Sequence, residues 1–378
     1  MTKMRVLFAG GGTAGHINPA LTVADILRQE GAEIAFAGTQ AGLEKDLVPR
    51  AGYRLHTLRV RPMPRRISPA LLKATFDAGV GLLQAFRIIG SFKPHVVVGT
   101  GGYVAGPVLL AAVLRRVPTV IHEQNAFPGS TNRLLAKWVD RVALGYREAA
   151  PRFPRQDKLV YVGNPVRSEL LTVSRTEGLR RLGLSPDRRH VLIFGGSRGA
   201  RSINRAVFAA RTALHQHRDV QFVHQTGAAG FPEVVEAYRS AGIEPVGDEL
   251  ILDHNIRVVP YVYDMPAALA AADLAVARAG ALTVAEITAR GVPSVLVPYP
   301  YATDDHQTFN ARPLVAAGAA RMIADGELTG ETLAAVLDEL LNDREGLRRM
   351  GEAAKTLGRP QAARELADLI RSVARPLP

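Results

Sequence analysis

Val6-Leu7-Phe8-Ala9 is a short apolar run that leads directly into the glycine-rich segment Gly10-Gly11-Gly12-Thr13-Ala14-Gly15-His16. The apolar run predicts a strand, and Asn18-Pro19-Ala20-Leu21-Thr22-Val23-Ala24 predicts the opening of a helix. Glycines let the backbone turn tightly and approach a ligand closely, while the amides at a helix start present hydrogen-bond donors and a partial positive charge. The stretch therefore predicts a phosphate-binding loop between a strand and a helix.

The spacing Gly10-x-Gly12-x-x-Gly15 also fits the dinucleotide-binding fingerprint. That fingerprint expects an acidic residue roughly 20 residues further on, at the end of the second strand, where it binds a ribose. The second predicted strand, residues 33–37, ends instead in Gly38-Thr39. A phosphate or sugar-phosphate site is therefore favoured over the nicotinamide site of an oxidoreductase.

Length and composition are those of a globular protein with roughly two or three domains, since the chain has 378 residues, 47% of them hydrophobic and 22% charged. The absence of cysteine excludes disulfides, a thiol nucleophile and cysteine-ligated zinc. Residues 104–114 form an apolar run that Gly106 and Pro107 interrupt, and the run is too short to span a bilayer. We expect neither a secretory signal nor a membrane-spanning segment.

The charge balance is basic, with 47 Lys and Arg against 35 Asp and Glu and a net charge of +12. Such an excess attracts polyanions, whether nucleic acid, anionic lipid head groups or phosphorylated substrates, although a general solubility charge explains it equally well. Aromatic residues make up only 6% of the chain, and no RNA-binding motif is visible. We therefore expect no nucleic-acid partner.

Short β-rich runs alternate with helical patterns in the first half of the chain, at residues 4–9, 33–37, 96–99, 119–122 and 141–144. This series predicts an α/β fold with a parallel sheet, whose ligands bind at the carboxyl ends of the strands. The loops expected at that edge are residues 10–16, 100–107 and 122–125.

A second strand and glycine loop, Val191-Leu192-Ile193-Phe194 followed by Gly195-Gly196-Ser197-Arg198-Gly199-Ala200, resembles the first nearly two hundred residues later. The repetition predicts two Rossmann-like domains, residues 1–164 and 165–357, that face each other across a cleft holding the site. Glycine and proline place the hinge near Gly163-Asn164-Pro165. The last helix, about residues 358–378, is expected to pack back on the first domain.

A basic segment, residues 61–66, precedes apolar residues that recur at helical spacing: Leu72, Phe76, Val80, Leu83 and Phe86. Such a stripe is usually a face that packs into the core. The alternative is a basic, apolar surface that lies on anionic lipid.

Two sets of polar residues follow predicted strands of the first half. His16 comes after the glycine loop and titrates near neutral pH, so it is a candidate general base or phosphate donor, the alternative being a helix histidine bonded to backbone. His122 and Glu123 could form an acid/base or acceptor-binding pair, or could have a capping or packing role.

In the second half, Thr283 and Glu286 have the spacing of a helix capping box, and Glu286 could equally accept sugar hydroxyls. The run Asp304-Asp305-His306-Gln307 contains possible metal ligands, but its spacing favours a polar loop. We therefore predict no metal site.

Seven motifs, in this order, resemble the MurG family of bacterial glycosyltransferases: Gly11-Gly12-Thr13-Ala14-Gly15-His16, Gly101-Gly102-Tyr103, His122-Glu123-Gln124-Asn125, Gly163-Asn164-Pro165-Val166-Arg167, Gly195-Gly196-Ser197-Arg198-Gly199-Ala200, Gly280-Ala281-Leu282-Thr283-Val284-Ala285-Glu286 and Asp305-His306-Gln307-Thr308-Phe309-Asn310-Ala311. Any one motif is weak, but seven in order over residues 11–311 are specific. A retaining or antibiotic-type transferase would share both glycine loops but not both the 122–125 and 305–311 motifs.

The resemblance implies a GT-B fold, two Rossmann-like domains with parallel sheets facing a central cleft. It implies an inverting transfer of N-acetylglucosamine from UDP-GlcNAc, a substrate, to the C4 hydroxyl of the muramyl sugar of lipid I, which yields lipid II for the cell wall. It implies no required cofactor. It places the protein at the cytoplasmic face of the membrane as a peripheral enzyme, against an anionic lipid surface and near other cell-wall and division proteins.

The resemblance also assigns residues. His16 is the expected base, and Asn125 and Asn132 are expected to position sugars. The expected donor contacts are Thr13, Ala14, Gly15, Asn125, Arg167, Ser197, Val262, Ala281, Leu282, Thr283, Glu286 and Gln307. The expected acceptor contacts are Gly12, Gly102, Tyr103, His122, Glu123 and Asn132. The expected membrane-facing residues are Arg65, Arg66, Leu72, Lys73, Phe76, Val80 and Leu83.

Three positions depart from the family pattern. Ala14 replaces a glycine, and its methyl is tolerable if its φ is negative. Ala279 replaces a serine, so a hydroxyl contact is lost there. Val262 replaces an isoleucine, and a backbone contact to uracil would survive that change.

Overall fold

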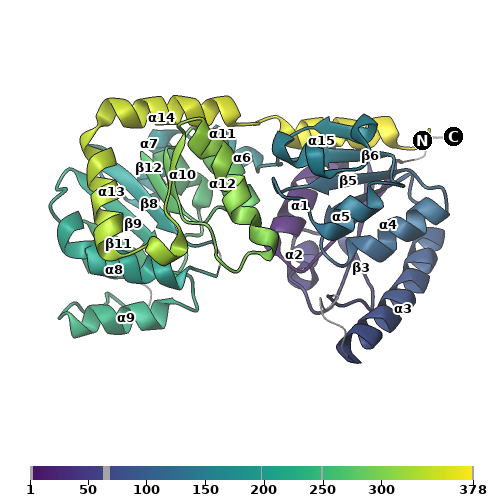
Figure 1. Ribbon diagram of the computed structural model, residues 1–378, viewed down its shortest axis with the longest axis horizontal. Coiled ribbons are helices and arrows are strands. Elements are labelled where there is room, and N and C mark those ends of the chain that lie inside the picture. The colour runs from purple at the N-terminus through teal and green to yellow at the C-terminus, as the bar shows by residue number, and fades with distance from the viewer. Residues whose placement is uncertain (1–2, 63–68, 197, 248–249, 377–378) are drawn as a thin grey trace. The chain divides into compact units, whose positions relative to one another are not determined.

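The computed structural model describes residues 3–62, 69–196, 198–247 and 250–376. The chain forms two compact units: residues 1–166 together with 359–378, and residues 167–358 (Figure 1). Each unit is an α/β structure built on its own sheet, and each is described by itself.

The described residues of the first unit form a seven-stranded sheet in the order β3-β2-β1-β4-β5-β6-β7, and every pair of neighbours is parallel. Its strands are β1 (Arg5–Gly10), β2 (Glu33–Gly38), β3 (Arg54–Thr57), β4 (Val96–Gly101), β5 (Thr119–Glu123), β6 (Arg141–Leu144) and β7 (Leu159–Tyr161). The first strand lies inside the sheet, between β2 and β4, so the loop that follows it sits well within the carboxyl edge.

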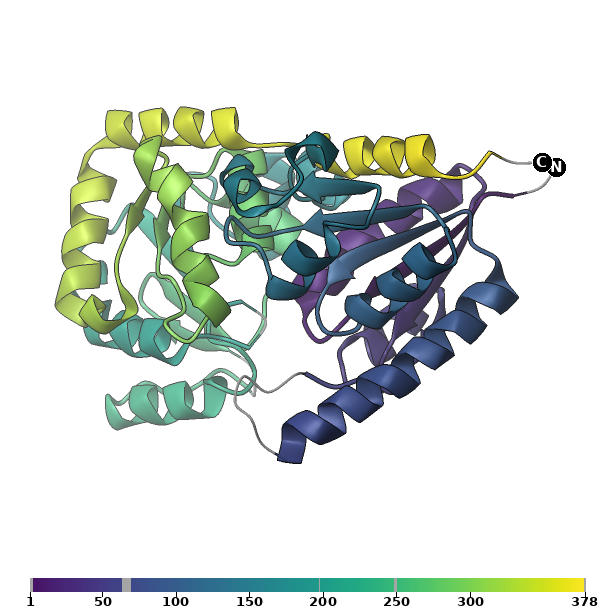
Figure 2. The ribbon, with the colours of Figure 1, turned by 45° about the vertical axis from the view of Figure 1, so that its right-hand side comes forward.

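The helices of the first unit cover both faces of this sheet. They are α1 (Ala14–Gln29), α2 (Glu44–Arg50), α3 (Pro69–Phe92), α4 (Ala105–Leu114), α5 (Ser130–Leu135), η1 (Arg147–Arg152), η2 (Gln156–Lys158) and α15 (Ala362–Val373). The helices α3 and α4 cover one face, and α1 and α15 cover the other (Figure 2). Apolar side chains of each pair form the core on their own face of the sheet. The last helix of the chain therefore completes the core of the first unit.

The second unit repeats the plan with a seven-stranded sheet in the order β10-β11-β9-β8-β12-β13-β14, again within the described residues. Only β10 runs antiparallel to its neighbour in this sheet. The strands are β8 (Arg189–Phe194), β9 (Val220–Gln225), β10 (Ile251–Asp253), β11 (Ile256–Val259), β12 (Leu274–Ala277), β13 (Ser294–Leu296) and β14 (Ala320–Met322).

The helices of the second unit are α6 (Ser168–Thr172), α7 (Arg175–Leu182), α8 (Arg201–Leu214), α9 (Phe231–Ser240), α10 (Met265–Ala271), α11 (Ala281–Arg290), η3 (Thr303–Asp305), α12 (His306–Ala316), η4 (Asp325–Glu327), α13 (Gly330–Asn342) and α14 (Arg344–Leu357). Apolar residues of α8, α9, α13 and α14 form one large core with residues of β8 and β9. Among the helices in the described residues, none combines the length and apolar character needed to cross a bilayer.

The predicted fold class is confirmed, because both glycine loops follow interior strands of largely parallel sheets. The predicted start of the first helix was wrong. The helix α1 begins at Ala14 rather than near Asn18, so Gly15 and His16 lie in its first turn and Pro19 lies inside it. A proline so near the start removes only the hydrogen bond to the Gly15 carbonyl, and the helix accommodates that loss.

Candidate functional site

The first glycine loop is fixed by a buried carboxylate. Glu44, at the start of α2, is 0% exposed, and its carboxylate accepts hydrogen bonds from the Gly12 amide at 2.9 Å and from the Thr39 amide at 2.9 Å. The Thr39 hydroxyl donates to the same carboxylate at 2.7 Å. Glu44, which lies six residues beyond the end of β2, was not among the predicted site residues. It belongs to no motif, so only the structure reveals its contact with the loop.

His16 lies against this loop with one ring nitrogen bound to backbone. Its Nδ1 is 3.0 Å from the Gly11 carbonyl oxygen and 3.2 Å from the Thr13 hydroxyl. A carbonyl oxygen can only accept, so in the neutral ring the proton is on Nδ1 and the lone pair is on Nε2. This tautomer is the one that a general base acting through Nε2 requires.

The second loop of the first unit packs closely on the first. A Cβ atom added at Gly102, whose φ is +78°, would lie 2.5 Å from the Gly11 carbonyl oxygen, so only glycine fits there. A Cβ atom at Gly101 would meet the His16 ring at 3.0 Å, and one at Gly12 would meet the Tyr103 ring at 3.4 Å. The structure thus brings Gly12, His16, Gly102 and Tyr103 together.

His122 is buried at the end of β5, although it was predicted to contact the acceptor. It is 0% exposed, its Nε2 donates to the Gly163 carbonyl at 3.1 Å, and its Nδ1 accepts from the Gln124 amide at 3.2 Å. Burial lowers the pKa of His122 to about 4. The geometry favours a packing role for His122 over the acid/base or acceptor-binding role that the sequence also allowed.

Glu123 is equally buried, at 1% exposure, and organises the segment that follows β5. One carboxylate oxygen accepts from the Asn125 amide at 3.0 Å, and the other accepts from the Gly129 amide at 3.0 Å and the Asn132 side chain at 2.8 Å. Asn132 is 3% exposed. These contacts make Glu123 and Asn132 positioning residues for Asn125 in this structure.

The second glycine loop, after β8, makes close backbone contacts within the second unit. A Cβ atom at Gly199, whose φ is +75°, would lie 1.8 Å from the Thr226 carbonyl oxygen. The buried side chain of Gln225 links this loop to the next one, because it donates to the Gly196 carbonyl at 3.0 Å and accepts from the Val262 amide at 3.0 Å. Gln225 was not among the predicted site residues. A uracil contact through the Val262 N–H would compete with the hydrogen bond from that N–H to Gln225.

The helix α11 begins at Ala281 with Gly280 as its N-cap, so the capping-box interpretation of Thr283 and Glu286 was wrong. No side chain in the described part of the chain caps this helix start, and its first turn contains no acidic residue. Its uncapped amides therefore form a positive end that suits an anion.

Glu286 lies one and a half turns into α11, with 20% of its side chain exposed and an Arg167 nitrogen 3.9 Å from its carboxylate. Burial raises the pKa of Glu286, and the Arg167 charge opposes that rise. Within the described residues, its carboxylate has no hydrogen-bond donor. It is therefore available to accept hydroxyl groups of a ligand.

The start of α12 is tied to the loops beside it. The Gln307 side chain accepts from the Tyr299 amide at 2.9 Å, and the buried Asn310 donates to the Ala279 carbonyl at 3.1 Å. The His306 Nδ1 lies 2.8 Å from the Thr303 carbonyl oxygen, and the Asp305 carboxylate accepts a hydrogen bond from the Thr308 hydroxyl. These local contacts make residues 304–307 a polar turn.

The other predicted site residues fall into three groups. Thr13, Ala14 and Gly15 lie at the start of α1, and Ala14 is not among the residues with positive φ, so its methyl is tolerated as expected. Ala281, Leu282 and Thr283 form the first turn of α11. Ser197, Arg65 and Arg66 lie outside the described residues.

The interpretation of the α3 stripe as a core face was wrong for three of its residues. Leu72, Phe76 and Leu83 are 76%, 64% and 63% exposed, and Lys73 is exposed beside them. Val80 is half-buried, while Phe86 packs toward the core. The opposite side of the helix carries the buried Asp77, which forms ion pairs with Arg59 and Arg61.

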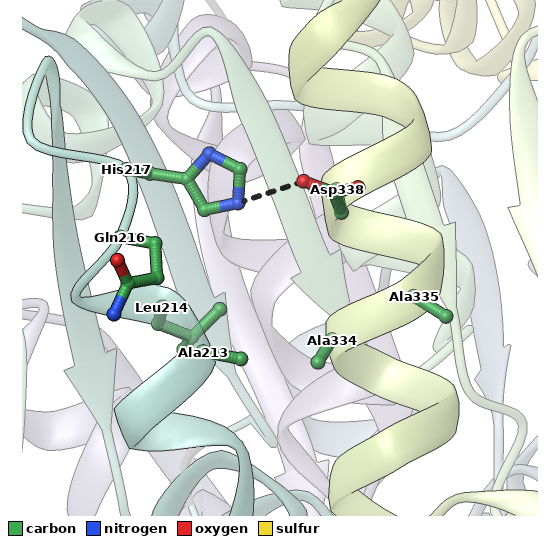
Figure 3. Close-up of a pocket in the computed structure, with 7 residues that line it drawn as sticks. All are labelled: Ala213, Leu214, Gln216, His217, Ala334, Ala335 and Asp338. Carbon is green, nitrogen blue, oxygen red and sulfur yellow. Dashed lines mark ion pairs between the residues drawn. The ribbon is translucent and has the colours of Figure 1, made fainter.

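An open pocket of about 270 Å³ lies between α8 and α13, away from the glycine loops (Figure 3). None of the predicted site residues lines it. Its lining is Ala213, Leu214, Gln216, His217, Ala334, Ala335 and Asp338.

Comparison with known families and proteins agrees with this arrangement of loops. Residues 6–144 match the glycosyltransferase family 28 N-terminal domain, and residues 190–366 match the glycosyltransferase family 28 C-terminal domain. These matches, together with the two Rossmann-like units, define the class as a family 28 glycosyltransferase of the GT-B fold.

Two curated relatives are similar along almost the whole chain. One, from Halothermothrix orenii, is 44% identical and covers 98% of this chain and 100% of its own. Another, from Desulforudis audaxviator, is 46% identical, and the match covers 98% of this chain and 99% of the relative. Both are named "UDP-N-acetylglucosamine--N-acetylmuramyl-(pentapeptide) pyrophosphoryl-undecaprenol N-acetylglucosamine transferase". The crystal structure of Acinetobacter baumannii MurG is 32% identical, with a TM-score of 0.76 over 98% of this chain and 99% of that one. The chain belongs to the MurG family of glycosyltransferases.

Proposed function

We propose that the protein transfers N-acetylglucosamine from UDP-GlcNAc to the C4 hydroxyl of the muramyl sugar of lipid I, giving lipid II for peptidoglycan synthesis. The observation that carries this proposal is the identity of 44–46% with transferases of that name over 98% of the chain. The two glycine loops and the uncapped start of α11 supply the phosphate-binding features that such a reaction needs.

In this reaction the acceptor hydroxyl loses a proton while its oxygen attacks the anomeric carbon of the donor sugar. The bond from that carbon to the diphosphate breaks, and UDP leaves with the electron pair, which inverts the configuration. His16 is the proposed base, because the Gly11 carbonyl holds its proton on Nδ1 and leaves the lone pair on Nε2.

The second unit, residues 167–358, is the proposed donor domain, for which the sequence predicts residues 165–357. The amides at the start of α11, from Ala281 to Thr283, would stabilise the charge that develops on the departing diphosphate, together with Ser197. Glu286 would accept the ribose hydroxyls, since its carboxylate is unsatisfied within the described residues. Arg167, Val262 and Gln307 are the remaining proposed donor contacts of this unit.

The first unit is the proposed acceptor domain. Gly12, Gly102 and Tyr103, which lie together beside His16, would face the lipid diphosphate. Thr13, Ala14, Gly15 and Asn125 would contact the donor from this side. We assign His122, Glu123 and Asn132 to the support of these loops rather than to direct contact, because all three are buried. The proposed reaction requires no cofactor, since UDP-GlcNAc is a substrate.

The exposed face of α3 is the proposed membrane contact. Leu72, Phe76 and Leu83 offer apolar surface, and Lys73 offers positive charge at the same face. A lipid-borne acceptor requires a peripheral enzyme at the cytoplasmic leaflet, where anionic head groups attract basic residues. Arg65 and Arg66 would add to this attraction, and other cell-wall and division proteins are further proposed partners.

The experiment that tests the function is the transfer of labelled GlcNAc from UDP-GlcNAc to a soluble lipid I analogue. Wild type should form the disaccharide product, whereas His16→Ala should lose turnover and still bind UDP. If the wild-type protein neither binds nor consumes UDP-GlcNAc, the proposed function is wrong, and a nicotinamide titration would test the oxidoreductase alternative.

A further inference from the structure

Three potential metal ligands meet in the second unit, and none of them belongs to a sequence motif of the substrate site. His215 follows α8, Asp253 is the last residue of β10, and His254 lies in the turn between β10 and β11. One ligand atom from each residue lies within 4.8 Å of the other two. Among the described residues, these three are the group of histidine and acidic side chains close enough together to share one metal ion.

Two of these ligand atoms are buried without a hydrogen bond. The His215 Nε2 and the Asp253 Oδ2 lie 3.1 Å apart, yet neither has a hydrogen-bond partner of acceptable geometry in the part of the chain that the structure describes. Asp253 is only 3% exposed. This contact is an ion pair only when the His215 ring is protonated. With a neutral ring the buried carboxylate oxygen is unsatisfied, which is costly, and a bound cation would satisfy both atoms.

The third ligand stands open to solvent. His254 is exposed, and its ring centroid lies 4.4 Å from that of His215. Its φ of +53° is a left-handed conformation that non-glycine residues adopt rarely. The site therefore has two buried ligand atoms and an accessible side through which an ion could enter.

The backbone around the cluster is held firmly. The buried side-chain amide of Asn255 donates to the carbonyls of Leu214, His217 and Val220, at 3.1, 2.9 and 3.0 Å. These contacts join the turn after β10 to the segment that connects α8 to β9. The three ligands are thus preorganised by a neighbour that is not itself a ligand.

We propose that His215, Asp253 and His254 bind a divalent transition-metal ion of the zinc type. Two imidazoles and one carboxylate are the ligands that such an ion prefers, and three protein ligands leave a fourth position for water. Magnesium and calcium favour sites made of oxygen ligands, so they fit this set poorly.

The proposed ion would act on stability rather than on the transfer reaction. The cluster lies at the amino ends of β9 and β11, whereas the glycine loop that follows β8 lies at the carboxyl edge of the same sheet. An ion bound there would cross-link the turn between β10 and β11 to the end of α8. It would stabilise the second unit without touching either substrate site.

The test is a zinc titration of the full-length chain without a polyhistidine tag, in competition with a chromophoric chelator. Wild type should bind one zinc ion per chain, and magnesium should not compete. His254→Asn, which suits the left-handed backbone, and His215→Gln should each weaken zinc binding by at least about tenfold. At about a hundredfold excess of free zinc over its Kd, the Tm of the wild type should rise by roughly 5 °C.

His217→Gln is the matched control. This histidine lies two residues beyond His215 but points to Asp338, whose carboxylate is 3.5 Å from its Nε2 (Figure 3). His217→Gln should leave the zinc affinity unchanged. The proposal is overturned if wild type shows no stoichiometric zinc site, or if His217→Gln weakens binding as much as the two ligand variants do.

Discussion

The Glu44 carboxylate accepts a hydrogen bond of 2.9 Å from the backbone amide of Gly12, 32 positions earlier in the chain. The same carboxylate holds Thr39 at the end of β2, so one buried charge joins the first glycine loop to the neighbouring loop. An acid after the second strand was expected only in a dinucleotide-binding protein, as a ribose ligand. Here the acid is used inside the protein, to fix the loop.

Glu44→Ala should destabilise the first unit and disturb its glycine loop. The change leaves the amides of Gly12 and Thr39 without an acceptor, which should lower the free energy of unfolding by about 2–4 kcal/mol. We expect kcat for GlcNAc transfer to fall with little change in UDP affinity. Denaturant unfolding and steady-state kinetics check this, with the exposed Asp46→Ala on the same helix as the control. Equal effects of the two variants would contradict the assignment.

His16→Gln should reduce kcat by roughly 10²–10⁴-fold, because the amide cannot accept the hydroxyl proton. UDP affinity, measured by calorimetry, should be retained within a few fold. Asn18→Ala, an exposed change on the same helix, should have little effect on either quantity. Turnover by His16→Gln at the wild-type rate would show that another group is the base.

Glu286→Gln should raise the KM for UDP-GlcNAc about 10–100-fold, as expected for loss of a charged hydrogen-bond acceptor. Because burial raises the pKa of Glu286, donor affinity should decline on acidification at a pH above that of an ordinary glutamate. The KM measured across acidic pH tests both points. A wild-type affinity that is flat down to the usual glutamate range would argue against a role for the charged carboxylate.

Replacing Leu72, Phe76 and Leu83 together with serine should weaken binding to vesicles that contain anionic lipid by at least about tenfold. Transfer to a water-soluble acceptor analogue should be unchanged, since these side chains are exposed and lie on α3. Vesicle co-sedimentation at low and high salt measures the effect. Val246→Ser removes an exposed apolar residue of the second unit and serves as the control.

His122 should make stability depend on pH. Its pKa is about 4 in the folded chain, against an ordinary value of 6.5 that the unfolded chain retains, so the unfolded chain binds the extra proton below about pH 6.5. The free energy of unfolding therefore keeps its full value, as far as His122 is concerned, above pH 6.5. It falls as the pH decreases toward 4, by a total of about 3 kcal/mol. Denaturant unfolding at several pH values should show a flatter dependence for His122→Gln than for wild type.

The sheets and both glycine loops were predictable, because strands buried on both faces are continuous apolar runs and glycine marks close backbone approach. The edge strands β3 and β7 were not predicted. Their residues are mostly half-exposed, so they lack the apolar run that identified β1 and β4. The start of α1 was misplaced because proline usually marks the first turn of a helix.

The supporting residues of the site could not be read from the sequence. The contacts of Gln225 with Gly196 and Val262 join segments up to 37 positions apart, and no local spacing records them. His122 and Glu123 were found by their place after a strand, but only the structure shows that both point inward. The cluster of His215, Asp253 and His254 was missed for the same reason, because its members come from two separated segments.

The placement of α15 has a consequence for biosynthesis. Residues 1–166 leave the ribosome before Leu366, Ala367 and Ile370, which complete the core over α1, are made. During translation the first unit therefore carries an uncovered apolar face, while the second unit, residues 167–358, is already whole. The order of synthesis thus means that the first unit reaches its final packing only after the whole second unit has been made.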